Sequence, residues 1–434
     1  MKYLPNILFA IVLLIGLGYF TWNVKKLVRN IKLGQDKDVS DKRSQRWKNM
    51  TMIALGQSKM VRRPIAGLLH VIVYVGFIVI NIEVLEIIID GLFGTHRIFS
   101  SMGSLYGILI GAFEILAVLV LAAVGVFWIR RNIIKLKRFM NPEMKGWPKN
   151  DGNIILYFEV VLMGLFLTMN ATDNVFQVAG SGNIVSQYLT SLFVGFSENT
   201  VHIIERSAWW LHIIGILIFL NYLYFSKHLH ILLAFPNTFY GRLTPKGKFN
   251  NLESVTNEVK MMMDPNIDPF AAPAEGTETI PAKFGASDVV DLDWVQLLNA
   301  YSCTECGRCT SECPANQTGK KLSPRKIMMD TRDRLEEVGK NIDTNNGEFK
   351  DDGKQLLDDY ITREELWACT SCNACVEACP VSIDPLSIIM EMRRYLVMEQ
   401  SAAPVELNNM MTNIENNGAP WPFNQMDRLN WKNE

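Results

Sequence analysis

Five stretches of this chain are too long and too poor in charge to belong to a water-soluble fold. A helix that spans a bilayer needs roughly 20 apolar residues, and each stretch is about that long. No small-residue cleavage pattern follows the first stretch, so we expect a retained helix and not a signal peptide. Residues 1–236 are therefore predicted to form a five-span membrane domain. The stretches are residues 3–24, 64–82 with an apolar continuation to Phe93, 98–129, 152–172 and 207–226.

Basic side chains are distributed unevenly among the connections between these stretches. Residues 25–63 hold twelve Lys and Arg and residues 130–149 hold seven, whereas residues 92–104 and 179–206 hold one each. Positively charged connections stay in the cytoplasm. The N-terminus is therefore predicted outside and the chain after the fifth span inside, in a multi-pass protein of a bacterial cytoplasmic (inner) membrane.

Histidines in the predicted spans suggest a haem site. His212 and His230 are 18 residues apart, which is five turns at 3.6 residues per turn, so on a continuous helix they share one face about 27 Å apart. His228 would be rotated by roughly 160° and would face elsewhere. His70 of the second span lies near the depth of His230. Two imidazoles on facing helices predict an inner haem b, although a lone His can also be a satisfied polar group.

The second membrane histidine, His212, lies deeper toward the outside and needs a partner if it is also a ligand. Only His96 and His202 are available on that side. We favour His96, with the loop of residues 91–103 folding back, as the partner in an outer haem b. The prediction is thus one haem b or two.

Acidic side chains also occur within the apolar stretches. One interpretation is that they pair between helices or lie at the membrane interface. The other is that they form a proton path to a quinone, because ionisable groups inside a bilayer are costly. These acids are Glu83, Glu86, Asp90, Glu114 and Glu159.

All eight cysteines lie between residues 303 and 379, in two runs of the pattern C-x₂-C-x₂-C-x₃-C-P. Four thiolates suit one [4Fe–4S] cluster, and in two-cluster folds the fourth Cys of each run ligates the other cluster. A cytoplasmic location argues against disulfides, and zinc sites do not use this spacing. One cluster is predicted on Cys303, Cys306, Cys309 and Cys379, and the other on Cys369, Cys372, Cys375 and Cys313.

The part of the chain after the spans has an ordinary soluble composition. Residues 237–290 are predicted to be a linker, 291–400 a helical ferredoxin-type domain with two clusters, and 401–434 a tail. Ser323 and Pro324 mark the start of a helix, whose basic side chains (Arg325, Lys326, Arg332 and Arg334) we expect to be solvated or, as the alternative, to dock an acidic partner. The net charge of −1 gives no support to a nucleic-acid partner. The fold class predicted is mainly α: a five-helix transmembrane bundle followed by this domain.

Two segments resemble a known family. Residues 209–236, with WWLHII and SKHLHI, and residues 302–327, with SCTECGRCTSECP, are similar to heterodisulfide-reductase-related membrane Fe–S oxidoreductases. That family includes the electron-transfer-flavoprotein:quinone oxidoreductases. The spacing of the two histidines in a five-span domain also resembles the haem b (gamma) subunit of respiratory nitrate reductase. The resemblance implies two haems b, two [4Fe–4S] clusters, exchange with quinone, and axial-ligand roles for His70, His212 and His230.

The sequence departs from the fused members of that family in one respect. Those members continue into a cysteine-rich module with CCG motifs, whereas this chain has no Cys after residue 379. The resemblance therefore implies that a separate cysteine-rich (CCG-type) Fe–S subunit is a partner. An electron-transfer flavoprotein is the expected donor.

No nucleophile or acid–base pair for group chemistry stands out, so the predicted work of the chain is to position redox cofactors. We predict an oxidoreductase component that passes electrons between a cytoplasmic Fe–S or flavoprotein donor and the quinone pool. The alternatives are a quinol-driven, heterodisulfide-reductase-like subunit, and a haem-free, ferredoxin-bearing membrane anchor or redox sensor.

Overall fold

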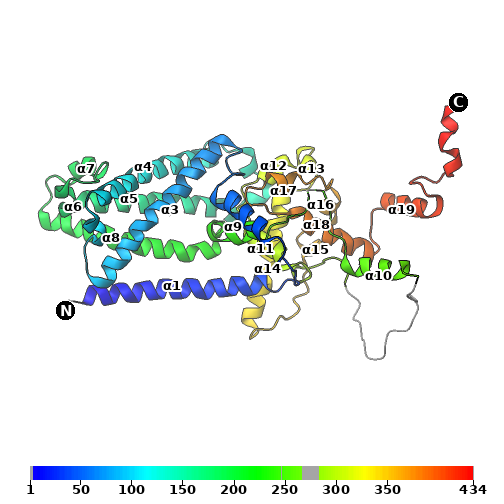
Figure 1. The fold of residues 1–434 in the computed structure, drawn as a ribbon, viewed down its shortest axis with the longest axis horizontal. Coiled ribbons are helices and arrows are strands. Elements are labelled where there is room, and N and C mark those ends of the chain that lie inside the picture. Colours follow the sequence, from blue (N-terminus) through cyan, green and yellow to red (C-terminus); the bar gives the residue numbers. More distant parts are fainter. Residues whose placement is uncertain (1–2, 246, 266–282, 434) are drawn as a thin grey trace.

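The computed structural model describes residues 3–245, 247–265 and 283–433. Five helices are long and apolar enough to cross a membrane, and they form an elongated bundle beside a smaller helical body (Figure 1). The described residues contain no β-strand, only two isolated bridges. The predicted spans and the mainly α fold are confirmed. The long helices are α1 Leu4–Ile31, α3 Pro64–Phe93, α4 Ser104–Asn132, α5 Trp147–Thr172 and α8 Glu198–Tyr222.

Small residues set how closely these helices pack. α5 packs against both α8 and α4, α3 packs against α4, and α1 lies against α8 and α3. A Cβ added at Gly91 of α3 would lie 2.6 Å from the ring of Phe9 in α1, and one at Gly76 would lie 2.6 Å from Val120 of α4. Close packing of this kind supplies the van der Waals contacts that associate helices in a bilayer.

The bundle has two ends, which we call the near end and the far end. The near end meets the cysteine-bearing body and holds the connections 32–63 and 133–146 (Figure 1). Its short elements are α2 Arg43–Met50, the π-helical turn η1 Thr51–Leu55, η3 Lys137–Phe139 and η4 Pro142–Met144. The far end holds η2 Ile98–Met102, α6 Asn174–Ala179, α7 Ser186–Leu189 and η5 Thr190–Phe193.

The fifth span does not continue as one helix to His230, contrary to the sequence prediction. α8 ends at Tyr222, and two short 3₁₀ turns follow, η6 Leu223–Phe225 and η7 Lys227–Leu229, before α9 His230–Phe239. Ser226 between the turns has an extended backbone (φ −119°, ψ 146°), and its hydroxyl accepts a hydrogen bond from the backbone N–H of His228. A serine that caps a new turn ends the preceding helix. The helical-phase argument that turned His228 away from His230 therefore fails.

Three of the five acids in the spans have structural partners. Glu86 accepts from the backbone N–H of Phe99 (2.9 Å) and from the hydroxyl of Tyr106 (3.1 Å). Asp90 accepts from backbone N–H groups of the loop that follows α3. Glu114 accepts from two backbone N–H groups at the start of α7 and from Asn170. These carboxylates tie the far-end loops to the bundle, as the structural interpretation of the acids predicted.

The smaller body packs short helices around one core beside the near end (Figure 1). It begins with the turn η8 Val289–Asp291, and its longest helix is α14, which Ser323 caps as predicted. α18 near the end of the body continues into the π-helical turn η9 Tyr395–Glu399. The helices are α11 Trp294–Tyr301, α12 Arg308–Glu312, α13 Pro314–Gln317, α14 Pro324–Thr344, α15 Leu356–Asp359, α16 Arg363–Trp367, α17 Ala374–Ala378 and α18 Pro385–Arg394.

The basic side chains of α14 are not a solvated face, and this expectation is corrected. Arg325 and Arg334 are fully buried. Arg334 pairs with two acids of its own body, Asp288 and Asp352. Arg325 reaches the membrane part, where its guanidinium bonds the carboxylate of Glu143 at 2.7 Å. A buried guanidinium needs such partners. The acidic groups that bind these two arginines of α14 are therefore residues of this chain.

Further polar contacts join the body to the near end. The Asn30 amide at the end of α1 donates to the Tyr301 hydroxyl at 3.0 Å, and the Asn237 amide in α9 donates to the Val381 carbonyl at 2.7 Å. Buried hydrogen bonds of this kind hold the cysteine loops in one position against the helices.

The segments on either side of this body contain isolated helices. Of the predicted linker 237–290, residues 246 and 266–282 lie outside the described residues, and α10 Glu253–Met263 occupies part of the rest. α19 Val405–Asn417 and η10 Gln425–Lys432 follow the body and bury none of their side chains. The domain limits drawn from the sequence stay a prediction.

Candidate functional site

The two cysteine runs fold into loops with the same backbone pattern. In each loop, the residue before the second Cys and the residue after it have positive φ: Glu305 (53°) and Gly307 (71°), then Ser371 (58°) and Asn373 (60°). Gly and Asn are the residues that adopt this conformation at least cost. The left-handed residues turn the backbone around the thiols, and α12 and α17 begin directly after Gly307 and Asn373.

Tertiary folding brings cysteines of the two runs close together. Cys303, Cys306, Cys309 and Cys379 line one small cavity, although Cys379 comes from the second run. The charge of Cys313 in the first run contributes to the raised pKa of Cys369 and of Cys375. Cys313 is therefore a neighbour of these two thiols of the second run. Packing of α12 against α17 produces this exchange. We call these the first and the second cysteine set.

Cys303 of the first set is buried, and the other three cysteines of the set are partly buried. Burial raises the pKa of Cys303 to about 12 and that of Cys379 to about 11. Burial and the charges of Cys303, Cys306 and Cys379 raise the pKa of Cys309 well above its usual value. Metal binding takes thiols as thiolates and releases their protons. Four thiols that line one cavity are therefore suited to hold a metal cluster.

Three histidines surround a larger cavity in the near half of the bundle. The rings of His70 in α3 and His230 in α9 have centroids 6.4 Å apart and planes tilted by 42°. His228 lines the same cavity, with its ring edge-on to His230 at 5.4 Å. The structure thus brings together the predicted pair, and it adds His228, which the sequence had placed elsewhere.

The environment of each ring nitrogen distinguishes these histidines. Nδ1 of His230 lies 3.1 Å from the backbone carbonyl of Lys227. A carbonyl partner on Nδ1 fixes the tautomer and leaves Nε2 free to bind a metal. Nδ1 of His70 is buried without a hydrogen-bond partner, which is costly unless another ligand occupies the cavity.

The histidine cavity adjoins the cavity of the first cysteine set. Both are lined by Thr304, Cys306, Pro380 and Val381. Lys227, which holds His230 through its carbonyl, also forms an ion pair with Glu305 in the first cysteine loop. Sequence reasoning missed this link. The signal available in the sequence was the acid Glu305 between Cys303 and Cys306, together with Lys227, a lysine just before two histidines.

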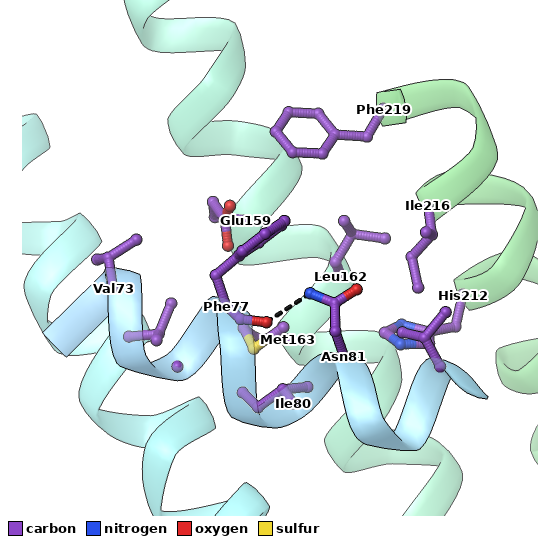
Figure 2. A pocket seen from close by; sticks show the side chains of 13 residues that line it. Val73, Phe77, Ile80, Asn81, Glu159, Leu162, Met163, His212, Ile216 and Phe219 are labelled. Atoms are coloured by element: carbon purple, nitrogen blue, oxygen red, sulfur yellow. Dashed lines mark hydrogen bonds between the residues drawn. The ribbon is translucent and has the colours of Figure 1, made fainter. Parts of the chain in front are cut away.

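The pairing of His212 with His96 predicted for an outer haem is not found. Nε2 of His96 lies 3.2 Å from the Asp173 carboxylate, and its side chain is 45% exposed. His212 is buried in α8 and lines another cavity (Figure 2). The other polar side chains in the lining of this cavity are Asn81 and Glu159. Among the described residues that line it, His212 is the only histidine. The loop after α3 is held by Asp90 and does not fold back to His212.

Fold and site together define a bundle of five apolar helices that carries a cysteine-rich, two-cluster body. Residues 302–383 match the family model of the 4Fe-4S dicluster domain. The two [4Fe–4S] clusters implied by the cysteine runs are supported by this match, and the assignment of each Cys to a cluster stays a prediction.

Longer relatives cover nearly the whole chain. The chain is 30% identical, over 99% of its length, to the probable iron-sulfur-binding oxidoreductase FadF of Bacillus subtilis, of which it covers 61%. It is 27% identical, over 91% of its length, to the EtfAB:quinone oxidoreductase of Syntrophomonas wolfei, of which it covers 55%. A third relative, the probable membrane-anchored ferredoxin of Chromohalobacter salexigens, is 32% identical over 35% of this chain and 24% of its own length.

These relatives, which also include heterodisulfide reductase subunits, confirm the resemblance to heterodisulfide-reductase-related Fe–S oxidoreductases, whereas the resemblance to the haem b subunit of nitrate reductase stays a prediction. The chain is therefore similar to iron–sulfur oxidoreductases and to heterodisulfide reductase subunits. It spans less than two thirds of the two longer relatives. No solved structure matches it.

Proposed function

We propose that the protein transfers electrons between a donor at the cysteine-bearing body and the membrane quinone pool, through two [4Fe–4S] clusters and one haem b. The observation that carries the proposal is the shared wall between the first cysteine cavity and the histidine cavity. A cofactor in each cavity would be separated by a few side chains only. The clusters and the haem, when bound, supply one-electron transfer.

The cysteine sets suggest an order along this route. Cys372 of the second set is exposed to solvent, whereas the first set lies against the bundle. A soluble partner would therefore meet the second set first. The first set would pass electrons on to the histidine cavity.

The residues of the histidine cavity fit haem b. Two imidazoles bound to one iron hold their ring centroids about 6 Å apart, because each metal–nitrogen bond is about 2 Å long, and His70 and His230 are separated by 6.4 Å. Haem b also carries two carboxylates, and the near end of the cavity supplies cations for them. Nε of Arg131 and Nε of Arg138 are buried without a partner. The cations that line the cavity are Arg130, Arg131, Arg138, Lys227 and Arg308.

The proposed orientation places the near end in the cytoplasm. The two connections with twelve and seven basic residues lie at that end, and positive connections remain cytoplasmic. The N-terminus of α1 would then lie outside the bacterial inner membrane. Donors that diffuse in the cytoplasm would reach the cysteine-bearing body.

The name of one relative, EtfAB:quinone oxidoreductase, supports an electron-transfer flavoprotein as donor and quinone as acceptor. A separate cysteine-rich subunit between donor and clusters remains part of the proposal. Similarity to heterodisulfide reductase subunits C supports a second candidate, reverse flow from quinol to a reductase partner.

Optical and magnetic spectra test the proposal. Protein purified anaerobically is expected to show a b-type α-band with one haem per chain and the signals of two [4Fe–4S] clusters. Reduction by an electron-transfer flavoprotein followed by reoxidation with a quinone supports the proposed direction, and quinol-driven reduction of the clusters supports the reverse. A protein with clusters but without a b-type band contradicts the proposal. It supports the alternative of a haem-free, ferredoxin-bearing membrane anchor.

A further inference from the structure

The cavity of His212 contains polar groups that the electron route does not use. It lies between α3, α5 and α8, and its wall is apolar except for Asn81, Glu159 and His212. Figure 2 shows these side chains, from three different helices, around the same space. An apolar cavity with a few convergent polar groups is the usual form of a small-molecule site.

Glu159 differs from the other acids of the spans in its hydrogen bonding and in the cavities that it lines. Glu86, Asp90 and Glu114 accept hydrogen bonds that fix loops. Glu83 and Glu159 have no hydrogen bond or ion pair within residues 3–245, 247–265 and 283–433. The carboxylate oxygens of Glu83 are buried, and Glu83 lines neither of the two cavities, whereas Glu159 lines both the His212 cavity and the histidine cavity.

An unpartnered carboxyl group in a membrane interior is costly when ionised, and such residues usually mark the path of a substrate or a proton. The Asn81 amide donates one N–H to the Phe77 carbonyl and has a second N–H left for a ligand, and His212 lines the same space. His212 is 1% exposed, and its Nδ1 has no partner. A flat apolar ring with two carbonyl oxygens matches the chemistry of these groups, because its faces are apolar and its oxygens can accept hydrogen bonds.

The cavity shares part of its wall with the histidine cavity, and part of that wall is exposed on the outside of the bundle. Phe77 and Ile78 of α3 line the histidine cavity while 40% and 48% of their surfaces stay exposed, so an apolar tail can lie along this face. Val73, Phe77 and Glu159 line both cavities. A ring next to Glu159 would thus be adjacent to the cavity that holds His70 and His230.

We propose that the cavity of Asn81, Glu159 and His212 binds the ring of a quinone, and that Glu159 is the catalytic residue that exchanges its protons. The inference rests on the proposed function, which supplies two electrons from a reduced flavoprotein through the clusters, one at a time. For each electron the O–H bond of the Glu159 carboxyl breaks and an O–H bond forms on a quinone oxygen. Water at the near end returns each proton to Glu159 through the adjoining cavity. Two electrons and two protons convert the quinone to quinol.

Stopped-flow mixing of the pre-reduced holoprotein with 2-methyl-1,4-naphthoquinone tests the role of Glu159. In Glu159→Gln, reoxidation of the clusters is expected to slow by about 100-fold, the usual contribution of a general acid, and to lose its pH dependence. Glu159→Asp restores part of the rate. Glu83→Gln is the matched control, because that acid is also without a hydrogen-bond partner but lines neither cavity, and it keeps the wild-type rate. A wild-type rate in Glu159→Gln overturns the proposal.

A second measurement locates the ring and separates this proposal from the proposed function. A photoreactive azido-quinone is expected to label peptides that contain Asn81 or Glu159, and Asn81→Leu is expected to raise the KM for quinone with kcat unchanged. Wild-type clusters that quinone does not reoxidise, with labelling in this cavity, would overturn the direction of electron flow and keep the site. Rapid reoxidation with labelling elsewhere would overturn the site and keep the function.

Discussion

Lys227 of η7 and Glu305 of the first cysteine loop form an ion pair in which the side chains are only 9% and 3% exposed. The carbonyl of Lys227 also lies 3.1 Å from Nδ1 of His230. Burial by itself would raise the pKa of Glu305, but Lys227 and Arg332 hold it below its usual value. One residue therefore contacts both the histidine cavity and the loop that carries Cys303 and Cys306.

The first prediction concerns this ion pair. Glu305→Gln leaves the buried ammonium of Lys227 without its main charge partner, and breaking a buried pair from one side costs about 3 kcal/mol or more. The free energy of unfolding of the cysteine-bearing body is expected to fall by that amount in a thermal or denaturant titration. In the double variant with Lys227→Met, part of the loss is expected to return, and the backbone carbonyl that holds His230 remains. Equal losses in the single and double variants would show that the pair contributes nothing.

The second prediction tests the crossed cysteine sets. Wild-type protein is expected to contain about eight iron atoms per chain in clusters. Cys379→Ala should destroy the same cluster as Cys306→Ala, although the two residues are in different runs, while Cys313→Ala destroys the other. Electron paramagnetic resonance of the reduced variants distinguishes the two signals. If Cys379→Ala and Cys375→Ala lose the same signal, each run binds its own cluster.

The third prediction concerns the haem ligands. His70→Ala and His230→Ala are each expected to abolish the same b-type band in reduced-minus-oxidised spectra. His228→Ala is expected to keep the band and shift it, because that ring contacts His230 edge-on at 5.4 Å. His212→Ala is expected to leave the haem content at one per chain. Loss of the band in His228→Ala, with retention in His230→Ala, would assign the ligand role to His228.

The fourth prediction follows from the acids at the interface between body and bundle. Burial raises the pKa of Glu143, but hydrogen bonds from Ser323 and Arg325 outweigh it and lower the pKa below 4.5. Since the folded-state pKa is depressed, the stabilisation is present above about pH 4.5 and is lost as the pH falls through the folded-state value. Glu305 has a depressed pKa as well and loses its contribution in the same direction.

Thermal unfolding between pH 7 and pH 3 measures this effect. The wild-type midpoint is expected to fall with acidification, and Glu143→Gln is expected to start lower at pH 7 and to fall less steeply. Parallel curves for the two proteins would mean that Glu143 makes no contribution to the pH dependence.

Local patterns were sufficient to predict the five spans, the cap at Ser323 and the two cysteine runs of the dicluster domain, since each follows from the spacing of residues within one segment. Charge-free runs of about 20 residues determine where the chain can cross a bilayer. The distribution of basic residues between connections likewise matches the two ends of the bundle. Even the exchange of Cys313 and Cys379 follows a rule for repeated runs.

Other features depend on segments that are distant in sequence. The break of α8 at Tyr222 brought His228 into the cavity, and the loop after α3, fixed by Asp90, kept His96 from His212. Nothing within residues 324–344 reveals that Arg325 pairs with Glu143 on another element. The helical period of 3.6 residues per turn determines which side chains share a face of an unbroken helix. Only the packed structure decides where that helix stops and which charges it meets, because burial and pairing depend on neighbours that come from elsewhere in the chain.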